Sequence, residues 1–237
     1  MIATNQHSSS DLHSKPFVVG RTGKRISTAS ISSQNNIRVL AALVETRRPA
    51  RTLEVGLALG CSALAMAGGH RANVSSPAGH HVAIDPFQES VWDDCGVLAL
   101  DAAGLSSFCT IMREHSWRAL PRLTDADEEF GILYIDGSHL FEDVFIDFFY
   151  CARLVGPGGI ILFDDASDRH VAKVIRFVRR NMLHAFREIG LEGYRDMTTT
   201  ADRLKYRAAR ALGRIQLVAF ERIGDPVRTW DSPFTAF

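Results

Sequence analysis

Residues 53–62 of this 237-residue chain read LEVGLALGCS. A short apolar run ends at Val55, and two glycines four positions apart, Gly56 and Gly60, come directly after it. Glycine lets the backbone turn sharply and lets a ligand approach closely. We therefore expect a strand that ends at Val55, a loop that binds a ligand, and a helix that begins at Ser62.

Strands and helices alternate outward from this loop. A helix over 33–46 is expected before it, because apolar residues recur there at helical spacing and Pro49 ends the segment. Further along the chain we expect strands over 51–55, 81–84, 108–112, 131–135 and 160–163, helices over 62–68, 89–103, 117–123, 141–154 (stopped by the glycine-rich run 156–159) and 171–189, and a final pair of strands over 197–200 and 215–220. This alternation predicts an α/β fold with a Rossmann-like, doubly wound sheet of about seven strands, mostly parallel with an antiparallel last strand, and with helices on both faces. Ligands of such sheets bind beyond the carboxyl ends of the strands.

The composition is that of an ordinary globular protein, with 46% hydrophobic and 23% charged residues. Residues 1–30 are rich in Ser, Asn, His and Gly and are expected to be a flexible arm, followed by one domain over 31–237. The formal net charge is zero, so nothing favours a nucleic-acid partner. Basic residues gather over 203–214, and we interpret them as a solvated helix face in preference to an anion-binding patch.

The cysteines and the N-terminal sequence indicate a cytoplasmic protein. Four scattered cysteines form no CxxC pair, which argues against a cysteine zinc site and favours reduced thiols; they are Cys61, Cys95, Cys109 and Cys151. Residues 1–16 lack the pattern of a signal peptide. No stretch approaches the roughly 20 apolar residues that a membrane span needs, so no membrane partner is expected.

Acidic residues at the first two strand ends point to a nucleoside ligand. Asp85 follows the expected strand 81–84, and a carboxylate there can accept hydrogen bonds from two ribose hydroxyls. NAD-binding folds use the same device, and a helix cap is the alternative role. The glycine spacing is not the G-x-G-x-x-G of dinucleotide folds, which argues against pyrophosphate recognition. Glu54 is a candidate acceptor for a ligand ammonium group or for the amides of the loop.

Carboxylates also follow the strands expected over 131–135 and 160–163. Asp136 follows the first, and Asp164 and Asp165 follow the second. If the two strands are neighbours, three carboxylates converge, and such a concentration of charge favours a bound cation. Oxygen ligands without cysteine favour Mg²⁺, with Mn²⁺ or Ca²⁺ as alternatives. The alternative is that Asp136 alone binds a cofactor or caps a helix, while Asp165 or Asp168 caps the next helix.

The pattern Glu54-x-Gly56-x-x-x-Gly60-x-Ser62, followed by Asp85, resembles the S-adenosylmethionine site of class I methyltransferases. This form is similar to the small-molecule O-methyltransferases, catechol O-methyltransferase among them. The resemblance implies that the loop contacts the methionine part of the cofactor and that Asp85 holds the ribose.

The later motifs extend the resemblance to metal-dependent members of that group. Ser116, in the stretch EHSW, matches their polar adenine contact. Asp136, Asp164 and Asp165 fall on their metal-ligand positions, which implies Mg²⁺ or Mn²⁺, and Asp136 is implied in cofactor binding and catalysis as well. The DGSH wording of 136–139 looks closest to the macrolide-sugar O-methyltransferases, in which the histidine is the general base, here His139.

These motifs lead to one hypothesis and three alternatives. The hypothesis is an S-adenosylmethionine-dependent O-methyltransferase in which a metal lowers the pKa of an acceptor hydroxyl and His139 takes the proton. The expected partners are a small-molecule hydroxyl compound (a sugar, a phenol or catechol, or a natural product) and a second copy in a dimer, as is common in such families. His170 is a candidate for the wall of the acceptor pocket, whereas His70, His80 and His81 are interpreted as loop residues. The alternatives are a metal-independent methyltransferase acting on N, C or O, an NAD-type oxidoreductase, and a binding protein that has lost its chemistry.

Overall fold

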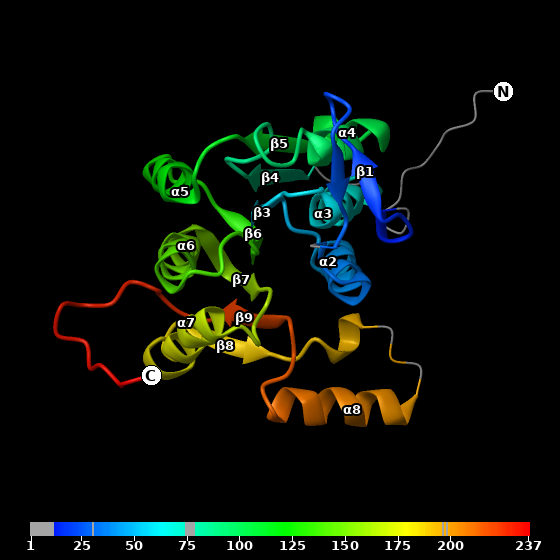
Figure 1. Cartoon of the computed structure of the whole chain (residues 1–237). Coiled ribbons are helices and arrows are strands. Elements are labelled where there is room, and N and C mark those ends of the chain that lie inside the picture. Colours follow the sequence, from blue (N-terminus) through cyan, green and yellow to red (C-terminus); the bar gives the residue numbers. More distant parts are fainter. Residues whose placement is uncertain (1–11, 30, 74–78, 196, 198) are drawn as a thin grey trace. The chain divides into compact units, whose positions relative to one another are not determined.

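The computed structural model describes residues 12–29, 31–73, 79–195, 197 and 199–237 (Figure 1). The chain divides into two compact units, Met1–His115 and Ser116–Phe237. Among the described helices, none combines the length and the apolar character that crossing a lipid bilayer requires.

The first unit is built on three parallel strands in the order β5-β4-β3. They are β3 (Arg51–Val55), β4 (His80–Ile84) and β5 (Cys109–Met112), and the helices of the unit are α2 (Gln34–Arg47), α3 (Cys61–Ala72) and α4 (Cys95–Ala102). β3 and β4 are buried along almost their whole length, as expected for strands covered on both faces. The predicted strands at 51–55, 81–84 and 108–112 are therefore confirmed, as is the helix at 33–46, which Ser33 caps.

The predicted helix over 89–103 is wrong in its first half, because residues 86–94 form turns and α4 begins only at Cys95. Asp93 and Asp94 adopt left-handed backbone angles, with φ of 46° and 59°, which interrupt a helix. Their carboxylates instead hold an upstream turn: Asp94 Oδ2 lies 2.7 Å from Arg21 Nε, and Asp93 Oδ2 accepts from the Thr22 hydroxyl at 2.9 Å.

Part of the segment expected to be a flexible arm forms a β-hairpin. β1 (Phe17–Val19) pairs antiparallel with β2 (Arg25–Ser27), and Ile26 packs against Leu59 and Cys95. Residues 1–11 lie outside the described residues. The mobility of the arm stays a prediction.

The second unit holds four strands in the order β6-β7-β9-β8. β6 (Phe130–Ile135) and β7 (Val155–Phe163) are parallel, and β9 (Val218–Arg222) runs antiparallel between β7 and β8 (Phe186–Ile189). The helices of this unit are α5 (Ser116–Asp125), α6 (Phe141–Leu154), α7 (Arg169–Asn181) and α8 (Thr200–Ala211). The structure also has two short 3-10 helices, η1 (Ser106–Phe108) in the first unit and η2 (Glu192–Tyr194) in the second. The strands of the two units follow the predicted α/β pattern of seven mostly parallel strands with an antiparallel last strand, which is confirmed.

Two elements of the second unit were predicted with the wrong extent. The helix expected over 171–189 stops at Asn181, and Phe186–Ile189 is a strand, because Phe186 turns inward to pack against Phe148 at a ring distance of 5.8 Å. The glycine-rich run 156–159 does not lie outside the sheet but belongs to β7, which begins at Val155.

The terminal strand pair was partly wrong. The strand expected over 215–220 is present from Val218 onward as β9. Residue 198 of the strand expected over 197–200 lies outside the described residues, and Thr199 caps α8 through a reciprocal capping box with Asp202, so that segment ends in a helix start. β9 pairs with β7 and β8 instead. No described residue of α8 is buried, in agreement with a solvated basic face.

Candidate functional site

The glycine loop at the carboxyl end of β3 needs its two glycines for conformational reasons. Gly56 and Gly60 have φ of 98° and 83°, in the region that favours glycine. A Cβ on Gly60 would also lie 3.1 Å from the backbone of Gly96. The Gly60 N–H donates to the Leu57 carbonyl at 2.7 Å, which closes the turn directly before α3. Ser62 lies in the first turn of α3 and is buried.

Asp85 braces this loop from the end of β4. Its Oδ2 accepts from the Ala58 N–H at 2.8 Å and from Gln88 Nε2 at 2.8 Å, and its Oδ1 accepts from the Phe87 N–H at 2.8 Å. Gln88 Nε2 also donates to the Ala58 carbonyl at 2.8 Å. Since each carboxylate oxygen can accept two hydrogen bonds, Oδ1 keeps capacity for a ligand hydroxyl. The fully buried Gln88 was missed by the sequence reasoning, because its contacts depend on tertiary folding alone.

Glu54 lies in a buried polar row beneath the loop. Its side chain is fully buried, neither oxygen has a hydrogen-bond partner among the described residues, and Oε1 lies 3.4 Å from His81 Nε2. The other ring nitrogen of His81 lies 2.9 Å from Thr52 Oγ1, which lies 2.9 Å from His70 Nε2. Glu54 therefore does not order the loop amides in this structure. Its buried carboxylate lacks a full set of donors, which fits a ligand that brings a cationic one.

The interpretation of His70, His80 and His81 as loop residues was wrong. His70 lies on α3, whereas His80 and His81 lie in β4. Burial, with smaller contributions from His81 and His80, lowers the pKa of His70 to about 4, so its imidazole is neutral at physiological pH.

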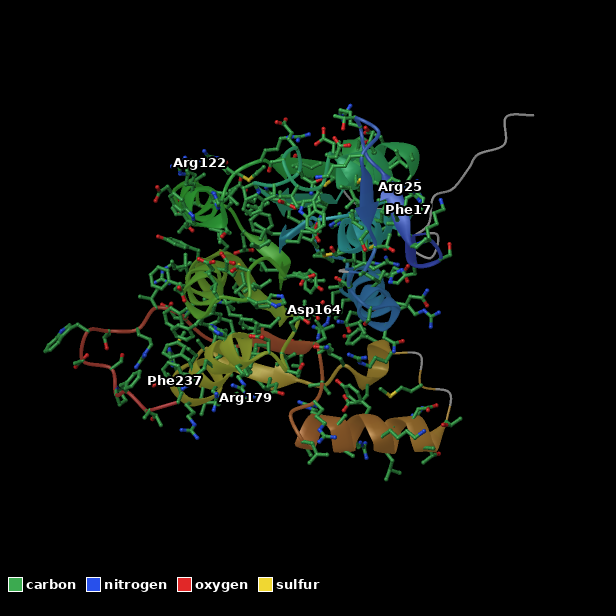
Figure 2. The ribbon with its side chains drawn as sticks, in the orientation of Figure 1. Phe17, Arg25, Arg122, Asp164, Arg179 and Phe237 are labelled. Carbon is green, nitrogen blue, oxygen red and sulfur yellow. The ribbon has the colours of Figure 1, made fainter. Side chains whose placement is uncertain are left out.

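In the second unit, β6 and β7 bring a set of acidic side chains to one edge. Ile135 is paired in register with Phe163, so Asp136 and Asp164 follow the ends of neighbouring parallel strands, as predicted. Figure 2 labels Asp164, which directly follows β7. Asp136, His139 and Asp165 each offer one ligand atom, and these atoms lie within 4.8 Å of one another. Two carboxylate oxygens and an imidazole nitrogen form a donor set that a divalent cation can use.

Asp164 is placed differently from the other two aspartates. It is buried, its Oδ1 accepts from the Asp165 N–H at 2.8 Å, and its Oδ2 accepts from the Tyr134 hydroxyl. The same hydroxyl lies 3.0 Å from Asp136 Oδ2, so Tyr134 links two of the three carboxylates. Sequence reasoning missed Tyr134, which looked like one more member of an apolar strand. The available signal was its position two residues before Asp136, on the same side of the strand.

His139 and Asp165 form a pair at this edge. His139 Nε2 lies 2.9 Å from Asp165 Oδ2, with side-chain exposures of 54% and 36%. The Ser138 hydroxyl donates to Asp143 at 2.7 Å, which fixes the turn that carries His139 into α6. Asp165 has a φ of 47°, a conformation that non-glycine residues hold mainly where the surroundings enforce it.

Ser116 and Asp168 have partners within their own unit. The Ser116 hydroxyl bonds to the buried carboxyl of Asp147, whose pKa is raised to about 7, chiefly by burial. The contact of Ser116 with adenine stays a prediction. Asp168 caps α7 by accepting from the N–H groups of His170 and Val171 at 2.8 and 3.4 Å, which is the capping role expected as its alternative.

Comparisons with known proteins agree with this layout. Residues 53–166 match the model of a family described as a methyltransferase domain. No curated protein sequence matches the chain. Among solved structures, an O-methyltransferase from Bacillus cereus in complex with S-adenosylhomocysteine is 16% identical, with a TM-score of 0.61 over 82% of this chain and 83% of that one.

A second solved structure has a similar fold. The O-methyltransferase TomG from Streptomyces achromogenes, involved in tomaymycin synthesis and solved with S-adenosylmethionine, is 17% identical, with a TM-score of 0.59 over 94% of this chain and 100% of that one. At such identities the likeness shows the fold, and the family match shows the domain. Residues 53–166, just under half of the chain, therefore match a methyltransferase domain, and the chain as a whole has the fold of these methyltransferases.

Proposed function

We propose that this protein is an O-methyltransferase that transfers the methyl group of S-adenosylmethionine to the hydroxyl of a small molecule with the help of a divalent cation. The observation that carries the proposal is the group formed by Asp136, His139 and Asp165, at the edge that β6 and β7 share. We also propose that it works in the cytoplasm as a dimer and does not act on nucleic acid.

The first unit supports cofactor binding through its loop and its acidic residues. Gly56, Gly60 and Ser62 form the loop and the first turn of α3, where a ligand can approach the backbone. Asp85 keeps one oxygen with capacity for a ribose hydroxyl. The buried carboxylate of Glu54 is the acceptor that we propose for the ammonium group of the methionine part.

The second unit supports acceptor activation. Asp136 and Asp165 are the proposed cation ligands, with Asp164 as the third because Tyr134 links it to Asp136. A divalent cation held there, Mg²⁺ or Mn²⁺, supplies Lewis-acid stabilisation of an ionised acceptor oxygen.

His139 is the proposed base. Its contact with Asp165 through Nε2 favours the tautomer with the proton on Nε2, and the lone pair is then on Nδ1. The Nδ1 atom takes the hydroxyl proton as the acceptor oxygen bonds to the methyl carbon. The sulfur–methyl bond breaks and S-adenosylhomocysteine leaves. Asp165 orients the ring and stabilises the imidazolium.

One observation favours a second candidate. The 2.9 Å contact between His139 and Asp165 makes a base with its own orienting carboxylate, which can take a proton without a cation. A metal-independent methyltransferase acting on N, C or O is therefore the alternative.

The two candidates differ in their response to metal removal and to Asp136→Asn. We expect methyl transfer to hydroxyl acceptors, detected by mass spectrometry, to stop in EDTA and to return with Mg²⁺ or Mn²⁺. Asp136→Asn is expected to abolish transfer, whereas calorimetry should show S-adenosylhomocysteine still binding to the variant and NAD binding to neither protein. Two results together would refute the cation role. The enzyme would be fully active in EDTA when its measured metal content is negligible, and the Asp136→Asn variant would be active as well.

A further inference from the structure

The second unit contains a cavity of about 490 Å³ whose lining shares no residue with the proposed cofactor and cation sites. Its lining combines two aromatic rings with three nitrogen-bearing side chains, contributed by Phe141, Arg169, His170, Lys173 and Phe237. The volume lies within the range of small-molecule sites, which is roughly 300–1,000 Å³.

The apolar walls are held in place by packing. The ring of Phe237 stacks on that of Phe141 at a centroid distance of 6.4 Å and meets Phe177 edge-on at 5.3 Å. The segment before Phe237 is tied to the end of α7, because Asn181 Nδ2 donates to the Thr235 carbonyl and the Thr235 N–H donates to Asn181 Oδ1, both at 2.8 Å. Figure 2 shows Phe237 beside α7. The two rings thus form a fixed surface that a flat apolar body can contact.

The polar wall is cationic. Arg169 and Lys173 are one helical turn apart on α7, so they lie on the same face of the helix. In the described part of the chain Arg169 has no ion-pair partner. The Lys173 ammonium lies 3.4 Å from the backbone oxygen of Phe237, which belongs to a carboxylate at this end of the sequence, so the wall keeps a net positive charge. The nearest acid along the helix, Asp168, already accepts from the backbone of α7. An anion is therefore the complement of this wall.

The cavity adjoins the segment that carries the proposed base. Phe141 begins α6 two residues after His139, and its N–H donates to His170 Nδ1 at 3.1 Å. This hydrogen bond joins the loop after β6 to the first turn of α7. A molecule in the cavity therefore lies against the same loop that positions His139.

We propose that the cavity binds the methyl acceptor and that the acceptor is an aromatic hydroxyl compound carrying an anionic group. Its ring lies against Phe141 and Phe237, and its anion pairs with Arg169 and Lys173. The inference rests on the proposed O-methyltransferase function and extends it to the class of substrate.

The test measures binding with probes that cannot be methylated, so it does not depend on turnover. The probes are 3-phenylpropionate, phenyl phosphate and the neutral 3-phenylpropanamide, titrated calorimetrically into the full chain with and without saturating S-adenosylhomocysteine. We expect both anions to bind at least about tenfold more tightly than the amide. The tighter of the two identifies the acceptor's anion as a carboxylate or a phosphate.

Variants assign the effect to the cavity. Arg169→Glu and Lys173→Glu should each remove the preference for the anionic probes over the amide. Phe237→Ala should weaken the binding of all three probes. The matched control is Arg176→Glu, an exposed cation on the same helix outside the cavity lining, which should keep the preference. Equal binding of anions and amide, or the same loss in Arg176→Glu as in Lys173→Glu, would overturn the proposal. Either outcome would leave the metal and methyl-transfer tests unaffected.

Discussion

Replacing Gly60 with alanine tests whether the loop after β3 depends on its left-handed backbone. An L residue in this region costs about 1–2 kcal/mol. The new Cβ would also lie 3.1 Å from the Gly96 backbone, which cannot move as a flexible side chain can. Alanine also lowers the conformational entropy of the unfolded chain, which stabilises the folded protein by about 0.4–1 kcal/mol. We therefore expect a net loss of about 1–2 kcal/mol in the free energy of unfolding.

Gly68→Ala is the matched control. Gly68 lies inside α3, and apart from its own helix backbone no atom of the described residues lies within 4 Å of the place that an alanine methyl group would occupy, so alanine should stabilise the protein by about 0.5–1 kcal/mol. Urea unfolding followed by circular dichroism gives both values, and calorimetry with S-adenosylhomocysteine should show about tenfold weaker binding for Gly60→Ala alone. Equal stability and equal affinity in the two variants would refute the reasoning.

Two further substitutions probe the second unit. Burial raises the pKa of Asp147 from 3.8 to about 7 in the folded protein, so on raising the pH the unfolded chain loses this proton first. The free energy of unfolding therefore falls by up to about 4 kcal/mol as the pH rises from 4 to 7. Asp147→Asn should flatten that fall in urea titrations, whereas Asp143→Asn, which removes only the smallest contribution to the raised pKa, should keep most of it; an unchanged slope in the first would contradict the assignment. Tyr134→Phe removes the hydroxyl that reaches two carboxylates and should lower metal-free stability by about 1–3 kcal/mol while enlarging the stabilisation by Mg²⁺. Tyr150→Phe, half-buried on α6, is the control, and equal thermal shifts with Mg²⁺ in both would count against the role of Tyr134.

The strand ends could be predicted from sequence because they depend on local pattern. The apolar run before Asp136 and the run before Asp164 each predict a strand, and two parallel strands separated by one helix are usually neighbours. The glycine loop could be predicted for a similar reason, since its backbone angles demand glycine at Gly56 and Gly60.

The missed features depend on contacts between distant segments. Residues 171–189 were predicted as one long helix, and packing against Phe148 makes Phe186 part of a strand instead. The carboxylates of Asp93 and Asp94 looked like helix surface until their bonds to residues 21 and 22 were known. Gln88 and Tyr134 likewise act through side chains whose partners are fixed by tertiary structure.

The hairpin of residues 17–27 ties the start of the chain to the glycine loop after β3. Ile26 covers Leu59, which lies between the two loop glycines, and Cys95, the first residue of α4. A shortened protein that starts at residue 31 would keep every strand from β3 onward but would lose the apolar contact of Ile26 with that loop. Trimming this end for crystallisation, or fusing a bulky partner there, would consequently alter the surroundings of a loop that lies more than twenty residues further along the chain.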